Sequence, residues 1–295
     1  MINKLEMLIA LEKESHFGRA AERLGLTQPT LSSGIRQLED HLGVRLVQRG
    51  SRYGGLTPEG QRALVWARQI VGDSRLLRAE MRASRDGLSG DLRLGVIPTA
   101  LTWASRLVTR YSKHHPNVRF KIISRSSSDI LRQMESLDLD AGITYLDNEP
   151  LGRVSTRFLY QETYVMVCGS DHPLAAQKHV TWAQVAEQDL CLLIPEMQNR
   201  RIINRAFMDA GTAPHPGLEA NSTVILMAQV SEAGRVTVLP RDQANFLAAG
   251  HSVQLLTIGP EGPSHDVGLV APQQALQTPV LEALMRIASD VSSES

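Results

Sequence analysis

The stretch AAERLGLTQPTLSSGIRQLEDHLGV, residues 20–44, carries two patterns in one segment. Leu31, Ile35, Leu38 and Leu42 recur three or four residues apart, which predicts one buried stripe of a helix. Small and polar residues surround this stripe, with TQPT directly before Leu31 and SSG directly after it. Glycine costs roughly 1 kcal/mol relative to alanine inside a helix. The polar side of this helix is therefore expected to meet something other than its own core.

The residues before this helix predict how it is presented. Hydrophobic residues near the start predict a first helix that ends near Ser15, and Phe17 to Leu24 predicts a short second helix that stops at Gly25. Thr27 is expected to cap the third helix, with Pro29 in its first turn. Two helices joined by a three-residue turn predict a helix-turn-helix, whose second helix enters the DNA major groove. The alternative is a generic three-helix bundle, which has no need of these residues on a solvent face.

A β-hairpin wing is expected after Gly43. Residues 45–49 and 56–57 predict two short strands, with a Gly-rich turn at residues 50–55. Arginines near the tip are placed for phosphate contacts, whereas glutamine and arginine on the helix can read base edges. The expected DNA-contacting residues are Gln28, Pro29, Thr30, Ser32, Ser33, Arg36, Arg49 and Arg52.

Residues 2–60 together resemble the LysR-type transcriptional regulators. The resemblance rests on the pattern F..AA..L..TQP.LS..I..LE..LGV.LV.R between Phe17 and Arg49 and on LTPEG at residues 56–60. It implies a homo-oligomer, a dimer of dimers, that binds a partly palindromic double-stranded operator and contacts RNA polymerase if it is an activator. The chain departs from the family at Ser33-Gly34, where a large polar or basic pair is usual, and at Val47, where an aromatic is usual. The first stretch is also similar to members linked to formate dehydrogenase operons.

The composition agrees with a soluble, cytoplasmic protein of two or three domains. The chain has 295 residues and no net charge, yet residues 1–90 contain 14 Lys and Arg against 10 Asp and Glu. No apolar run is long enough to span a membrane, and the first residues lack the features of a signal peptide. No membrane partner is therefore expected.

A long helix is expected after the wing. From residue 59 to residue 85 no strand or turn signal occurs, and a seam recurs three or four residues apart at Ala63, Ala67, Ile70, Ser74, Leu77, Met81 and Ser84. We expect this helix to pair with the same helix of a second chain; the alternative is a long surface helix packed on its own domain. The predicted domains are a winged helix-turn-helix at 1–58, a dimerising linker helix at 59–88 and an effector-binding domain at 91–295.

Residues 91–295 alternate between strand-like and helix-like segments, which predicts parallel α/β structure in two lobes. Lobe one is expected at about residues 91–161 and 266–295, and lobe two at about residues 162–265. Segments such as DLRLGVIPTAL and EAGRVTVLPRD resemble the effector-binding domain of the same family. The resemblance implies a fold like that of periplasmic solute-binding proteins.

Polar residues at the ends of predicted strands suggest a ligand site, because ligands bind beyond the carboxyl ends of strands in α/β sheets. Serine hydroxyls and the free N–H groups of a helix N-terminus favour an anion, so a small carboxylate is the expected effector. The alternative for the serines, and for Asn221 and Thr223, is plain helix capping. The expected effector-binding residues are Pro98, Thr99, Ala100, Ser126, Ser127, Tyr145, Met197, Gln198, Asn199, Asn221 and Thr223.

The sequence gives little support for catalysis. No GxSxG, HExxH or phosphate-binding loop occurs, no Cys/His spacing suits a metal, and no cofactor is expected. His172 lies in a predicted turn and is expected to be structural. Cys168 and Cys191 lie in apolar runs and are expected to be buried, with a redox-sensing regulator as the alternative. A solute-binding or enzymatic α/β protein with no DNA role is the other alternative.

Overall fold

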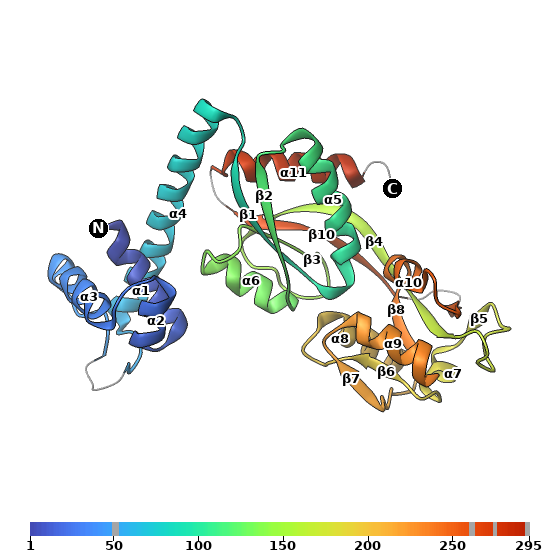
Figure 1. The fold of residues 1–295 in the computed structure, drawn as a ribbon. Helices are drawn as coiled ribbons and strands as arrows, with labels where there is room; N and C mark the ends of the chain where they lie inside the picture. Colours follow the sequence, from blue (N-terminus) through green and yellow to red (C-terminus); the bar gives the residue numbers. More distant parts are fainter. Residues whose placement is uncertain (49–52, 260–262, 274–275, 293–295) are drawn as a thin grey trace. The chain divides into compact units, whose positions relative to one another are not determined.

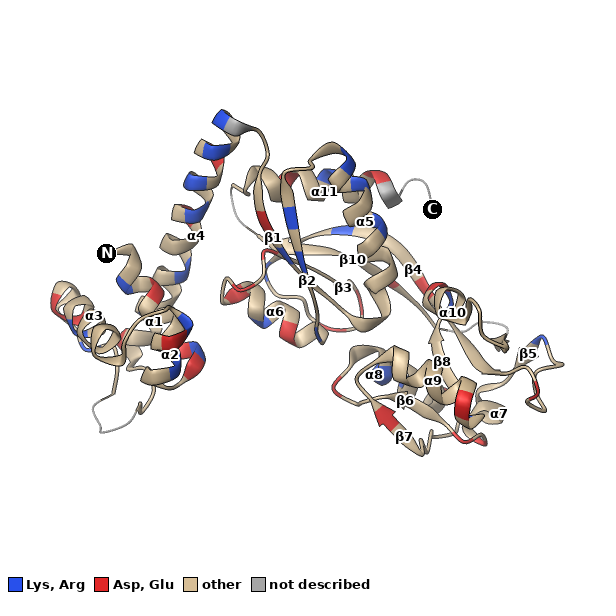
Figure 2. Cartoon of the chain, viewed as in Figure 1, with Lys and Arg blue, Asp and Glu red and all other residues tan. Residues whose placement is uncertain are grey.

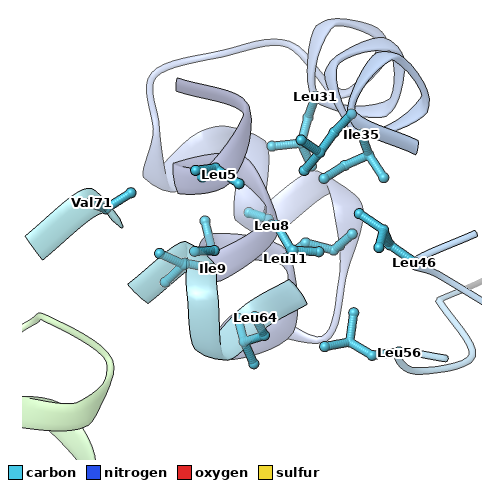
Figure 3. Packing of buried hydrophobic residues seen from close by; sticks show 14 of the residues in the cluster. Leu5, Leu8, Ile9, Leu11, Leu31, Ile35, Leu46, Leu56, Leu64 and Val71 are labelled. Carbon is cyan, nitrogen blue, oxygen red and sulfur yellow. The ribbon is translucent and has the colours of Figure 1, made fainter. Parts of the chain in front are cut away.

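The computed structural model describes residues 1–48, 53–259, 263–273 and 276–292, and the chain divides into two compact units (Figure 1). The first unit consists mainly of residues 1–89 and contains α1 (Ile2–Glu14), α2 (Phe17–Arg23), α3 (Gln28–Leu42) and α4 (Pro58–Asp86). Its core is one apolar cluster that includes Leu8, Leu11 and Leu31, all fully buried (Figure 3).

The α2–turn–α3 segment has the predicted helix ends. Thr27 accepts a hydrogen bond from the Thr30 N–H through its side chain, and Gly43 ends α3 with a φ of 70°. His16 caps α2, with its Nδ1 accepting the N–H groups of Gly18 and Arg19 at 3.1 and 3.3 Å. The sequence reading did not find this cap.

Gly34 does not lie on the exposed polar face of α3 to which the sequence analysis assigned it. It is buried rather than exposed, and a Cβ built on it would lie 2.2 Å from the Met7 sulfur on α1. This glycine therefore permits close packing of α3 on α1, and the solvent face of α3 carries the other small and polar residues.

The described part of the wing contains less strand than predicted. Its described part holds a single antiparallel bridge between Val47 and Leu56, flanked by a 3.0 Å bond from the Gln48 N–H to the Gly55 carbonyl. Glu39 of α3 fixes the first side of the wing, because its buried Oε1 accepts the N–H groups of Leu46 and Val47 at 2.8 and 3.2 Å. The predicted tip residues Arg49 and Arg52 lie outside the described residues.

The long helix α4 has two different apolar faces. Leu64, Ala67 and Val71 are buried against the first unit, whereas Ile70, Leu77 and Met81 are exposed. The predicted seam is therefore wrong at Ala67, which belongs to the core of its own unit. The exposed stripe instead includes Trp66, which is 63% exposed. Arginines occur along the length of this helix (Figure 2).

The second unit contains two lobes joined by a shared strand. The first lobe has strands in the order β2 (Val118–Ser124), β1 (Gly90–Val96), β3 (Ala141–Tyr145), β10 (Ser264–Pro272) and β4 (Val154–Gly169). The first three strands are parallel, and β10 runs antiparallel to both β3 and β4. This lobe also contains η1 (Pro98–Ala100), α5 (Leu101–His114), α6 (Ser127–Glu135) and α11 (Pro279–Ser292).

The strand β4 continues into the second lobe, where it pairs with β8 (Thr237–Pro240) and β9 (Val253–Ile258). The short β5 (His179–Val180) extends that sheet, and β6 (Cys191–Leu193) pairs with β7 (Leu218–Ala220). Helices α7 (Trp182–Ala186), α8 (Gln198–Asp209), α9 (Thr223–Ala233) and α10 (Arg241–Ala248) complete the lobe. The pairing of β4 passes from β10 to β8 between Thr163 and Tyr164, and β9 pairs from Val165 onward.

Candidate functional sites

The exposed face of α3 is the first candidate site. Gln28, Pro29, Thr30, Ser33 and Arg36 are exposed, and Ser32 is half-buried. The Arg36 Nε donates to the Ser32 carbonyl at 3.4 Å, which is a long bond that leaves the rest of the guanidinium available. The face combines one long cation, an amide and hydroxyls, which are the groups that contact DNA bases and phosphates.

A cleft between the two lobes is the second candidate site. Eight of the predicted effector residues line one cavity of about 10 Å³, together with Ile97 and Leu193. These eight are Pro98, Thr99, Ser126, Ser127, Tyr145, Met197, Gln198 and Asn199. A cavity of this volume holds about one water molecule, so the cleft is closed in this conformation.

Three predicted residues do not line this cavity. Asn221 is exposed, and Ala100 is buried without reaching the cavity wall. Thr223 is linked to the cavity wall only through Gln243, whose Nε2 donates to the Thr223 Oγ1 at 3.0 Å and to the carbonyl of the wall residue Pro98 at 2.8 Å. Ser222 is the N-cap residue of α9, but its side chain forms no capping hydrogen bond.

The two serines at the start of α6, Ser126 and Ser127, have different roles. The Ser126 Oγ accepts the Asp129 N–H at 3.2 Å and therefore caps the helix. Ser127 is 4% exposed, and its hydroxyl is buried with no partner in the described residues. A buried polar atom without a partner is costly. This hydroxyl at the N-terminus of α6 thus adds an available donor to the cavity wall.

Hydrogen bonds between the lobes keep the cleft closed. The Trp103 Nε1 of lobe one donates to the Asp242 Oδ2 of lobe two at 2.8 Å. The Gln243 Nε2 donates to the Pro98 carbonyl at 2.8 Å, and the Asn199 Nδ2 donates to the Tyr145 hydroxyl at 3.2 Å. Each bond joins a residue of lobe one to a helix of lobe two, so opening the cleft requires all three to break.

A buried carboxyl lies behind the cavity wall, and the sequence reading missed it. Glu162 on β4 is 1% exposed and accepts from the hydroxyls of Tyr145 at 2.5 Å, Tyr164 at 2.7 Å and Tyr160 at 3.2 Å. Burial raises the pKa of the Glu162 carboxyl to about 7, although the hydroxyls of the three tyrosines and the Asn199 amide lower it. The signal in the sequence was the alternation YQETY, which places Tyr160, Glu162 and Tyr164 on one face of a strand.

The two cysteines lie in the core of the second lobe. Cys168 on β4 and Cys191 on β6 are both fully buried. Burial raises the pKa of each thiol to about 11, so both are protonated at neutral pH. Reactive cysteines have the opposite features, namely exposure and a depressed pKa.

The remaining candidates are structural. The His172 Nδ1 accepts the Leu174 N–H at 3.2 Å, which stabilises a local turn.

Within the described residues, no group of three or more His, Cys, Asp and Glu side chains is arranged to hold a metal ion. No helix in the described part of the chain has the length and apolar character needed to cross a membrane.

Comparison with known proteins matches each of the two units to a protein-family model. Residues 2–61 match the model of the bacterial regulatory helix-turn-helix proteins of the lysR family, and residues 85–293 match that of the LysR substrate binding domain. A probable hydrogen peroxide-inducible genes activator of Mycobacterium xenopi is 32% identical over 177 residues, which is 60% of this chain and 93% of the relative. The dual regulator OxyR of Escherichia coli is 29% identical over 240 residues, covering 81% of this chain and 78% of OxyR.

Solved structures share the fold of one or both units. A variant of full-length OxyR from Pseudomonas aeruginosa has a TM-score of 0.75 at 24% identity, covering 98% of this chain and 94% of that one. The effector binding domain of QuiR in complex with shikimate has a TM-score of 0.61 at 20% identity, covering 70% of this chain and 98% of that one. With both units matched along their lengths, the chain belongs to the LysR family and is a DNA-binding transcriptional regulator rather than an enzyme.

Proposed function

We propose that this regulator responds to a small organic acid that binds between the lobes of its second unit. The observation that carries the proposal is the buried Ser127 hydroxyl at the N-terminus of α6, for which the described part of the chain offers no hydrogen-bond partner; Ser127 and Thr99 line the same cavity. A hydroxyl and the free N–H groups of a helix N-terminus together favour a carboxylate. The shikimate held by the related QuiR domain is an acid of this class.

The closed cleft explains how such an acid would signal. An acid of several heavy atoms exceeds a cavity of about 10 Å³, so its binding requires the lobes to separate. When the lobes separate, the Trp103–Asp242 and Gln243–Pro98 hydrogen bonds break. The second unit then changes from a closed to an open arrangement of its lobes. A ligand shifts such an equilibrium by its difference in affinity for the two states.

The test is calorimetric titration of the full-length protein with acetate, lactate, succinate, shikimate and benzoate. Loss of one hydrogen bond to a charged acceptor costs roughly 1.5–3 kcal/mol. Ser127→Ala and Thr99→Val are therefore expected to weaken acid binding about tenfold or more. Asn221→Ala is the matched control and is expected to bind as the wild type does, because Asn221 is exposed and outside the cavity. Wild-type affinity in both cavity variants would contradict this site.

We further propose that the α3 face reads the operator, with Gln28, Thr30, Ser33 and Arg36 near bases. Gln28→Ala is expected to reduce discrimination between operator and random DNA by roughly 1–3 kcal/mol, because the amide can bond two atoms of one adenine edge. Fluorescence anisotropy with both DNAs measures this ratio. The control Gln69→Ala changes an exposed amide of α4 and is expected to keep the wild-type ratio. An unchanged ratio in Gln28→Ala would place the reading surface elsewhere.

The described geometry gives less support to a redox sensor built on Cys168 and Cys191. Relatives from Mycobacterium xenopi and from Escherichia coli O6:H1 are named as hydrogen peroxide-inducible genes activators, but both thiols of this chain are fully buried with a raised pKa. Peroxide reacts with exposed thiolates far more readily than with buried thiols. The cleft between the lobes is thus the better-supported sensing site.

A further inference from the structure

Tyr145 separates the cleft from the buried carboxyl of Glu162. Tyr145 lines the cavity, and its hydroxyl contacts two other lining residues: it accepts from the Asn199 Nδ2 at 3.2 Å and lies 3.5 Å from the Thr99 Oγ1. On the other side it donates to the Glu162 Oε1 at 2.5 Å. Since a tyrosine has a single hydroxyl proton, it donates either inward to Glu162 or outward to the cavity.

The protonation state of Glu162 decides which of these occurs. An ionised carboxylate only accepts, so it holds the Tyr145 proton and places a negative charge one hydroxyl away from the cavity. A protonated carboxyl has a donor of its own, which releases the Tyr145 proton for a group in the cavity. The protonated form therefore provides one more donor and one less negative charge to an incoming acid.

We infer that Glu162, acting through Tyr145, selects the charge of the effector, and that an anionic effector binds together with one proton taken from solvent and held on Glu162. This inference rests on the proposed binding of a small acid and names the residue that makes that binding proton-linked. Glu162 is a positioning residue in this scheme, because Tyr145 and not Glu162 lines the cavity.

The groups around Glu162 support an exchange of one proton. The tyrosines on β3 and β4 that face it have pKa values well above 10, chiefly because of burial and then because of the Glu162 charge, so they stay protonated. From helix α8 the neutral Asn199 amide bonds to Tyr145, whereas the charged Arg200 and Arg201 of the same helix are paired with Glu219 and Glu149. Farther out, His265 of β10 packs edge-on against Tyr145 and pairs with Asp147, and Asp242 of α10 lies near Tyr160. The ordinary range of a carboxyl is too low for exchange at neutral pH, but burial brings the pKa of Glu162 to about 7.

The test measures proton uptake on binding with the full-length protein. Each acid of the panel above is titrated calorimetrically between about pH 6 and pH 9, in two buffers of different ionisation enthalpy. We expect the affinity of the wild type to fall by up to tenfold per pH unit above about pH 7, with uptake approaching one proton. E162Q keeps an acceptor and adds a permanent donor, so its affinity is expected to be independent of pH and about tenfold above that of the wild type at about pH 8.

Two controls make the result specific to Glu162. Glu187→Gln removes an exposed carboxyl of the second lobe and is expected to keep the wild-type pH profile. The neutral amides of the acids are expected to bind wild type and E162Q with no proton uptake. Circular dichroism establishes that each variant is folded.

The possible failures are distinguishable. Acid binding to the wild type without proton uptake, or the same pH slope in wild type and E162Q, would overturn this inference and leave the proposed acid site standing. Absence of binding of every acid to both proteins at about pH 6 would overturn the proposed function, and this inference with it.

Discussion

Glu162 shows how one buried group makes stability depend on pH. Folding raises the pKa of its carboxyl from 4.5 to about 7, chiefly by burial, so the folded state binds the proton more tightly than the unfolded state. A raised pKa contributes stability that is fully present below about pH 4.5 and is lost as the pH rises to about 7. The rise in the pKa of Glu162 from 4.5 to about 7 corresponds to about 3 kcal/mol of folding stability, at 1.36 kcal/mol per pKa unit.

E162Q removes this dependence, because an amide does not titrate in this range. We expect the free energy of unfolding of E162Q, relative to wild type, to rise by about 3 kcal/mol between pH 5 and pH 8. Urea denaturation at several pH values, followed by circular dichroism, measures this difference. The Glu187→Gln control is expected to show no such trend, and a flat difference for E162Q would show that Glu162 does not titrate in the folded protein.

At the scale of an element, α4 combines a face that packs within its own unit with a face that has no partner there. Leu64, Ala67 and Val71 are buried, and an ion pair between Arg68 and Glu12 joins the same part of the helix to α1. About 100° around the helix, Trp66, Ile70, Leu77 and Met81 form a stripe of exposed apolar side chains. We propose that this stripe, and not the seam through Ala67, pairs two chains.

Leu77→Asp tests this pairing. Leu77 is 58% exposed, so an aspartate is tolerated in the single chain, but it would bury an unpaired charge in a paired helix. Sedimentation velocity is expected to show loss of the dimer, with the helical content unchanged. Gln61→Asp places the same charge on the exposed surface of α4, on the side of the helix opposite the stripe, and is expected to keep the wild-type mass. A Leu77→Asp protein of unchanged mass would exclude the stripe from the dimer interface.

At the scale of the second unit, β4 connects the lobes and also carries Glu162. Its first part pairs with β10 up to Thr163, and its last part pairs with β8 and β9 from Tyr164 onward. The carboxyl therefore lies at the point where the chain passes from one lobe to the other. A change in lobe arrangement alters the surroundings of Glu162 directly, since Tyr145 belongs to lobe one and Asn199 to lobe two.

Local patterns were sufficient for the helix-turn-helix and for the alternation of strands and helices. The Thr27 cap, the Gly43 stop and the spacing of Leu31, Ile35 and Leu38 are interactions within one segment, and such interactions are visible in a sequence. The resemblance of residues 2–60 to the LysR-type regulators added the function. It rests on consecutive residues of one unit, and the family comparison confirmed it.

Only the tertiary structure decided which faces are buried and which side chains meet. Gly34 and Ala67 fit an exposed face or a seam by spacing alone, but α1 packs against both positions and buries them. Thr99, Ser127 and Asn199 lie on segments far apart in the chain, and the folding of two lobes around β4 brings them to one cavity. Glu162 had no counterpart in the sequence reading, because a raised pKa arises from burial among tyrosines contributed by two strands. Contacts between distant segments depend on packing, which the periodicity of a single segment does not specify.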